Sequence, residues 1–204
     1  MSLEFLITAL IVVLVPGTGV VYTVAVGLGT GRQASVAAAF GCTLGIVPAI
    51  LASVLGLAAL MHTSALVFQA VKYAGVAYLL YLAWQTLKDS GPLDLGARKE
   101  VGKSLVSIAC TGFLINILNP KLTVFFLAFL PQFVGHQSAN AALEMLALGA
   151  VFMAMTFAVF VVYGLFASLV GEKLLRSDRA MAWMRRTVAA AFAGFSLRLA
   201  LAER

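Results

Sequence analysis

Lys121 stands near the middle of an apolar stretch that runs from residue 105 to residue 133, directly after Asn119 and Pro120. A charged side chain at the centre of a bilayer costs about 2.5–3.5 kcal/mol even on the mildest insertion scale. Proline adds a second cost, because it has no amide hydrogen and so frees the carbonyl of Asn116 four residues earlier. A cation and an interrupted backbone at one depth predict a hydrated, ligand-facing site. We expect Lys121 to neutralise a substrate carboxylate or to titrate during transport, and the alternative is that it snorkels to the interface or forms a structural ion pair.

The composition indicates that the whole chain is a membrane protein. Hydrophobic residues make up 62% of it and charged residues 11%, whereas a typical soluble domain has about 45–50% and 25%. The informative count is therefore of apolar stretches near 20 residues, the length that crosses the hydrocarbon core as a helix. The six stretches are residues 3–28, 35–60, 64–87, 105–133, 141–170 and 185–202.

The basic residues predict the orientation of these spans. Ten of the 14 Lys and Arg lie on the connections after the first, third and fifth stretches, which the positive-inside rule places in the cytoplasm. Both termini are then expected outside. This topology accounts for the net charge of +6 without nucleic-acid binding. Short outer loops and the absence of HExxH, Walker-type and Gly-x-Ser-x-Gly motifs argue against an enzyme.

Pro16 and Pro120 suggest that the chain has two related halves. When these two prolines are aligned, Gly31 also meets Gly135, and each half contains three apolar stretches. An odd number of spans turns the second copy over relative to the first, as in many secondary transporters. The sequence thus predicts an all-α membrane protein of six transmembrane helices, arranged as two inverted three-helix repeats with proline-broken helices one and four. One transporter domain, 1–204, would comprise repeat one at about 1–88, a cytoplasmic loop at about 88–104 and repeat two at about 105–204.

Broken helices put partial charges at membrane depth. The chain after each break offers free amides, which favour an anion, and the chain before it offers free carbonyls, which favour a cation. A small zwitterionic amino acid needs both. Pro16, Gly17 and Thr18 would form the first-half break, opposite the second-half break around Asn119 and Pro120. Asn119 could equally be a substrate ligand or only the cap of the second half-helix.

Small residues recur every four positions along the second stretch, which predicts close approach of another helix. The alternative, that they line the translocation path, stays open. Two cysteines, Cys42 and Cys110, lie within predicted spans. We expect them to be small packing residues, and the alternative is that they form an intramembrane redox pair. The recurring small residues are Ala37, Gly41, Gly45, Ala49 and Ser53, with Pro48 expected to kink the helix among them.

The chain resembles the lysine exporter and homoserine/threonine resistance (LysE/RhtB) family of amino-acid exporters over nearly its whole length. One departure stands out: the family usually has Pro-Gly-Pro-Asn in the first span, whereas this chain has Thr18-Gly19 after Pro16-Gly17. The segments that carry the resemblance are Pro16-Gly17, Gly31-Arg32, the run from Lys72 to Trp84, Gly112-Phe113, Asn116, Asn119-Pro120-Lys121, Phe125-Phe126 and Leu130-Pro131-Gln132-Phe133.

The resemblance implies export of amino acids or close derivatives, such as homoserine, threonine or lysine, across the bacterial inner membrane by proton antiport. It implies no cofactor, and it leaves a homo-oligomer open. Further substrate contacts are expected from Lys72 and Tyr78 of the third span, although an interfacial position for Lys72 and interfacial anchoring by Tyr78 are the alternatives.

Two points remain open in the sequence. No carboxylate lies at the centre of a span, so the proton carrier could be Lys121 or the substrate, or the membrane potential alone could drive export. The alternative function is a transporter of divalent cations or of thiol reducing equivalents, for which Cys42 and Cys110 are the available intramembrane ligands.

Overall fold

The structure, a computed structural model, describes residues 2–14, 17–61, 102–134 and 140–170, together with isolated helical residues between 70 and 84 and at 186, 190 and 194. All the regular elements in these parts are helices. They are α1 (Leu3–Leu14), α2 (Thr18–Thr30), α3 (Arg32–Leu44), α4 (Val47–Met61), α6 (Leu105–Ile117), α7 (Pro120–Phe129), the 3-10 helix η2 (Leu130–Phe133) and α8 (Ala141–Val170).

Two helical stretches are long and apolar enough to cross a membrane, Arg32–Gly56 and Ala141–Leu169. The pair α1 and α2 passes the same criterion when taken together, with a bend of 53° between its halves. The third and sixth predicted spans fall almost wholly outside the described residues. The number of six spans and their inverted arrangement therefore stay predictions.

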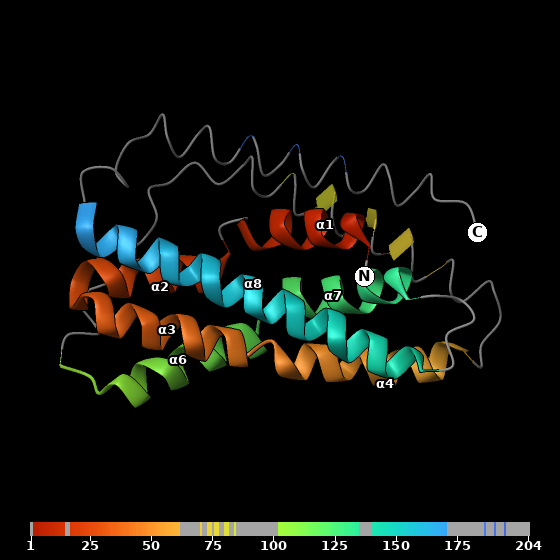
Figure 1. Ribbon diagram of the computed structural model, residues 1–204, viewed down its shortest axis with the longest axis horizontal. Coiled ribbons are helices and arrows are strands. Elements are labelled where there is room, and N and C mark those ends of the chain that lie inside the picture. Colours follow the sequence, from red (N-terminus) through yellow and green to blue (C-terminus); the bar gives the residue numbers. More distant parts are fainter. Residues whose placement is uncertain are drawn as a thin grey trace.

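α3 and α4 follow one another along one side of the molecule, and they pack against the pair α6 and α7 (Figure 1). α6 packs along α3, and α7 packs along α4. α8 crosses the bundle as one continuous helix of 30 residues that contacts α2, α3 and α4, and also α1. An uninterrupted helix is thus in contact with all four helices of the first half that the structure describes.

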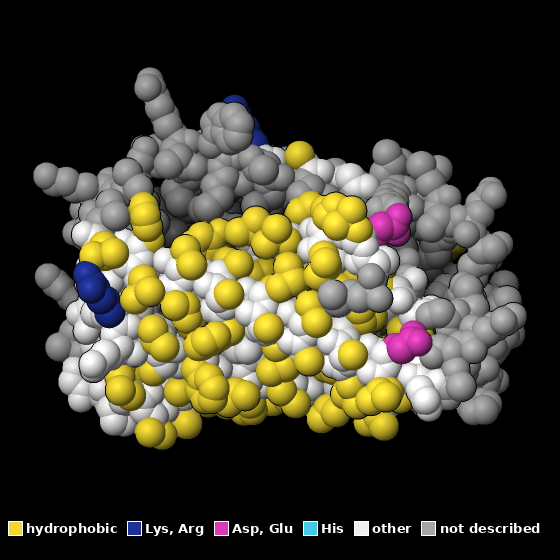
Figure 2. Space-filling model, viewed as in Figure 1, with side chains coloured by type: hydrophobic (Ala, Val, Ile, Leu, Met, Phe, Trp, Pro, Cys, Tyr) yellow, Lys and Arg dark blue, Asp and Glu magenta, His cyan; other side chains and the backbone are white. Residues whose placement is uncertain are grey.

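The ends of the helices are sorted by charge (Figure 2). The basic residues Arg32 and Lys103 lie near the starts of α3 and α6, at one end of the molecule. Glu4 and Glu144 lie in the first turns of α1 and α8, at the opposite end. Between the two ends the visible face is largely apolar, as expected for a surface that contacts lipid tails.

The small residues of the second stretch do allow the backbones to approach, as predicted. A Cβ added to Gly45 would lie 2.6 Å from the carbonyl oxygen of Phe113, and one on Gly112 would lie 2.9 Å from that of Ala38. A Cβ on Gly41 would overlap the Ala109 carbonyl outright. These distances are shorter than real Cβ contacts, so α3 and α6 can pack in this way only with glycine at all three positions.

α3 is interrupted just before Pro48, where a kink was expected. α3 ends at Leu44 and α4 begins at Val47. Pro48 cannot donate to the Leu44 carbonyl, and its ring would clash there in a regular helix. The Ile46 amide donates instead to Thr43 at 3.1 Å, so it does not complete the regular helical bond to the carbonyl of Cys42.

We expect Gly41→Ala to destabilise the protein by about 1–3 kcal/mol, because the new methyl group meets the backbone of α6 rather than a movable side chain. Gly56→Ala is the matched control on the same predicted span, since its Cβ would meet only the end of Leu127 at 3.3 Å. Thermal unfolding in detergent micelles compares the two. Equal melting temperatures would refute the close packing of α3 on α6.

Candidate functional site

The two helix interruptions, one from each half of the sequence, meet in the structure. Thr18 is the first residue of α2, and Asn119 immediately precedes α7. The Asn119 side-chain amide donates to the Thr18 hydroxyl over 3.3 Å, although the residues are 101 positions apart. The starts of two half-helices are therefore neighbours, and the hydrogen bond between them is exposed.

Asn116 connects these two interruptions with a third, the break between α3 and α4 just before Pro48. Its side chain is 3% exposed, and its Nδ2 donates to the carbonyl oxygen of Cys42 at 2.7 Å. That carbonyl is the one that the Ile46 amide does not engage. A side chain from the last turn of α6 thus satisfies a backbone acceptor at the break between α3 and α4, where no water is expected to replace it.

The other end of the Asn116 amide rests on α2. A Cβ on Gly19 would lie 2.8 Å from Asn116 Oδ1 and 2.9 Å from Cε2 of Phe160. The Cys42 thiol also approaches the Gly19 carbonyl, with 3.8 Å between sulfur and oxygen. Gly19 stands where the family usually has asparagine, and no side chain of that size fits beside Asn116 and Phe160 as they lie here.

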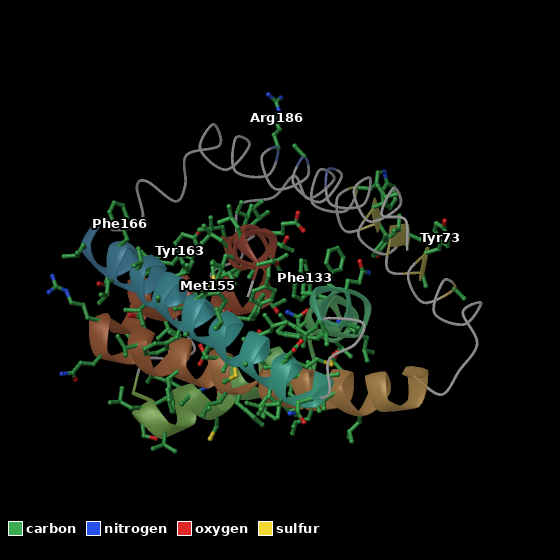
Figure 3. All side chains as sticks on the ribbon, turned by 45° about the vertical axis from the view of Figure 1, so that its right-hand side comes forward. Tyr73, Phe133, Met155, Tyr163, Phe166 and Arg186 are labelled. Atoms are coloured by element: carbon green, nitrogen blue, oxygen red, sulfur yellow. The ribbon has the colours of Figure 1, made fainter. Side chains whose placement is uncertain are left out.

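Tyr163 holds the end of the half-helix α1. Its hydroxyl donates to the carbonyl of Leu14, the last residue of α1, over 3.1 Å. Figure 3 shows Tyr163 on the side of α8 that is turned toward α1. The final carbonyls of a helix have no intrahelical partner, so this bond stabilises the end that the interruption creates.

A small cavity of about 30 Å³ lies where these elements meet. It has room for about one water molecule. Its polar wall contains the side chains of Asn116, Asn119 and Thr156 and the bare backbone of Gly17 and Gly19. The apolar wall consists of Val12, Val13, Ile46, Leu122, Phe152 and Phe160.

Two positive helix ends converge at this cavity. The first amides of α2 lack intrahelical acceptors, whereas α7 begins with Pro120, which has no amide hydrogen, and its Leu122 amide donates to the Asn119 carbonyl at 3.2 Å. Free amides at the start of α2 and the dipoles of both helices favour an anion. Gly17 caps α2 without any side-chain hydrogen bond, so it leaves those amides to another acceptor. An arrangement of this kind suits a carboxylate better than a cation at the polar wall.

The structure brings together part of the predicted site. Gly17, Asn116 and Asn119 line the cavity, and Thr18 contacts Asn119. Pro120 and Lys121 are the first two residues of α7, but their side chains lie outside the described residues, as do Pro16, Lys72 and Tyr78 altogether. The substrate roles of all these residues stay predictions.

Four residues of α8 were not predicted from the sequence. Phe152, Thr156 and Phe160 line the cavity, and Tyr163 donates a hydrogen bond to the end of α1. Polar groups within an apolar helix were a usable signal for Thr156 and Tyr163, because a buried hydroxyl normally has a partner. Phe160 carried no such signal, since phenylalanine is common throughout these spans.

The described residues contain no group of three or more His, Cys, Asp and Glu side chains that could hold a metal ion. Both cysteines are free thiols, with Cys42 buried against α2 and α6 and Cys110 exposed. Cys42 therefore packs as a small residue between helices, which was the first of the two roles predicted for it.

We expect Asn116→Ala to lower the free energy of unfolding by about 1–3 kcal/mol, because the buried Cys42 carbonyl loses its donor. Thr18→Ala should cost less than about 1 kcal/mol, since its hydroxyl is exposed and water can serve its partner. Denaturant titration in detergent measures both. If the two variants lose the same stability, Asn116 does not organise the interruptions.

Comparison with known proteins finds several relatives of this chain. An uncharacterized membrane protein of Vibrio cholerae is 31% identical over 201 residues, which cover 98% of this chain and 97% of that protein. The homoserine/homoserine lactone efflux protein of Salmonella typhimurium is 31% identical over 138 residues, covering 68% of this chain and 66% of its own. A leucine efflux protein of an Enterobacter species is 24% identical over 201 residues, covering 96% and 93%.

No solved structure matches the chain significantly. The LysE type translocator family matches residues 10–203, which include every described element except the first residues of α1. This match confirms the resemblance inferred from the Asn119-Pro120-Lys121 region and the segments around it. The chain belongs to the LysE type translocator family.

Proposed function

We propose that the protein is a secondary active exporter of amino acids or their close derivatives across the bacterial cytoplasmic membrane, working by proton antiport. The observation that carries the proposal is the contact between Thr18 and Asn119 beside the cavity, where α2 and α7 begin. Two helix N-termini that meet beside a polar cavity wall favour the binding of a carboxylate. Efflux of homoserine or its lactone and of leucine by named relatives supports an amino-acid cargo.

Lys121 would add a full positive charge to the helix N-termini that recognise the substrate carboxylate. It is the second residue of α7 and lies two positions after Asn119, which lines the cavity. A cation in the first turn of a helix opposes the helix dipole, so its position is unfavourable unless an anion is bound. We therefore assign Lys121 to the substrate carboxylate, with the ends of α1 and α6 offering carbonyls to the ammonium group.

Transport requires this site to open. A cavity of about 30 Å³ has room for about one water molecule and not for an amino acid, so the residues around it must move apart when a substrate binds. The Thr18–Asn119 bond is long at 3.3 Å and joins one half of the sequence to the other. Breaking it costs little. In our proposal the half-helices separate there, and substrate enters from the cytoplasm and leaves on the outer side.

An arrangement of two inverted repeats, which the sequence predicts, fits this mechanism. In Figure 1 the pair α1 and α2 runs through the molecule in the direction opposite to α6 and α7. Opposite directions for corresponding spans are what two inverted repeats require. The clustering of Arg32 and Lys103 at one end supports a cytoplasmic position for that end, with both termini outside.

Overproduction of the chain in bacteria should raise extracellular amino acids and confer resistance to toxic amino-acid levels. Lys121→Met should reduce export about tenfold or more, equivalent to about 1.4 kcal/mol, because it removes the carboxylate's counter-charge. Lys103→Met is the control, as Lys103 lies outside the membrane stretch before α6. Export is compared at equal membrane abundance. Wild-type export by Lys121→Met would reject the assignment.

Proton antiport makes a separate prediction for purified protein in proteoliposomes. Efflux of a substrate amino acid should fall when an ionophore collapses the pH gradient, because the inward proton flux supplies the driving force. The same vesicles with the membrane potential clamped distinguish this from electrical coupling, which is worth about 2.3 kcal/mol per charge per 100 mV. Efflux that ignores the pH gradient would exclude proton antiport and leave amino-acid export standing.

A further inference from the structure

We infer that the substrate of this site carries an uncharged, apolar side chain, and that Phe160, packed against Gly19, is the wall that selects it. The inference rests on the proposed export function and narrows its substrate class. It follows from three features: the division of the cavity wall, the fit of Phe160 onto Gly19, and the position of the acidic residues.

The cavity has a polar part and an apolar part. The polar groups belong to the helix interruptions, where the backbone-like part of an amino acid would be recognised. The remaining lining residues that the structure describes are aliphatic and aromatic side chains from α1, α7 and α8, together with Ile46. Thr156 adds little polarity, because its hydroxyl donates to the Phe152 carbonyl at 2.9 Å. A substrate side chain lying against this wall meets hydrocarbon.

Phe160 completes that wall because residue 19 is glycine. The ring edge lies so close that a Cβ on Gly19 would be 2.9 Å from Cε2. Phe160 itself is only 6% exposed. With a side chain at position 19, the ring would have to move, and the wall would change in both shape and polarity. The Gly19–Phe160 pair is therefore a feature of this chain that acts on the substrate side chain.

A cationic substrate side chain would have no counter-charge at this depth. None of the described residues that line the cavity is ionisable. The acidic residues Glu4 and Glu144 lie in the first helical turns at one end of the molecule, and the other six Asp and Glu fall outside the predicted apolar stretches. Burying an unpaired ammonium group is far more costly than burying a methyl group.

Norleucine and lysine make the matched test, since lysine is norleucine with an amino group at the end of the side chain. Proteoliposomes with the full-length protein are preloaded with either labelled amino acid, and efflux is followed under an imposed pH gradient against protein-free vesicles. We expect norleucine to leave at least about tenfold faster than lysine. Lysine efflux equal to or faster than norleucine efflux would overturn the inference while leaving amino-acid export intact.

A wider panel of substrates distinguishes failure of the export function from failure of the apolar substrate class. If none of the twenty standard amino acids, norleucine, homoserine and its lactone leaves faster from protein-containing vesicles, the export function itself fails. If only amino acids with charged side chains leave, export stands and the apolar substrate class is wrong.

Phe160→Ala tests the selecting wall. Loss of the Phe160 ring should shift the substrate preference about tenfold from norleucine toward the bulkier phenylalanine, because the cavity becomes larger on that side. Phe166→Ala is the control on the same helix, since Phe166 is 55% exposed and lies beyond Tyr163 toward the end of α8 (Figure 3). Phe160→Leu, which keeps more of the packing, should show a smaller shift in the same direction. Unchanged preference in Phe160→Leu and in folded Phe160→Ala would remove Phe160 from this role.

Discussion

The amide of Asn116 is the interaction on which the arrangement of the broken helices depends. Its nitrogen engages the Cys42 carbonyl beside the break between α3 and α4, and its oxygen lies against Gly19 in the first turn of α2. Asn116 itself lies in the last turn of α6. One buried side chain thus connects three interruptions. Since unsatisfied backbone groups are costly inside a bilayer, the breaks are stable only when such partners lie within reach.

That reach exists because glycine replaces larger residues at the helix contacts. Gly41, Gly45 and Gly112 bring α3 and α6 together until backbone atoms touch, and Gly19 leaves room for Asn116. Packing in lipid gains little from the hydrophobic effect, so close van der Waals contact and interhelical hydrogen bonds hold the helices. The small-residue stripe therefore does more than fill space: it sets the distance at which Asn116 can bond to Cys42.

An unbroken helix complements the broken ones. α8 runs for 30 residues and contributes Phe152, Thr156 and Phe160 to the cavity and Tyr163 to the end of α1. Aromatic contacts fix it against α7, with ring centroids 5.4 Å apart for Phe125 and Phe152 and 5.0 Å for Phe126 and Phe152. These buried phenylalanines form part of the hydrophobic core. In the proposed mechanism, the continuous helix α8 would keep one wall of the cavity in place while the half-helices separate.

Sequence alone determined the membrane class, the two apolar stretches that the structure shows as helices long enough to cross a membrane, the close approach of another helix to the second stretch, and the family. All of these follow from local quantities: apolar length, glycine spacing and the Asn119-Pro120-Lys121 signature. It also pointed to Gly17, Thr18, Asn116 and Asn119. Only the tertiary structure decided which partners those residues have, because Thr18 and Asn119 are 101 positions apart and Asn116 and Cys42 are 74. The roles of Phe160 and Tyr163 were equally invisible, since they depend on which face of α8 meets α1 and α2, and no periodicity within one helix specifies its neighbour.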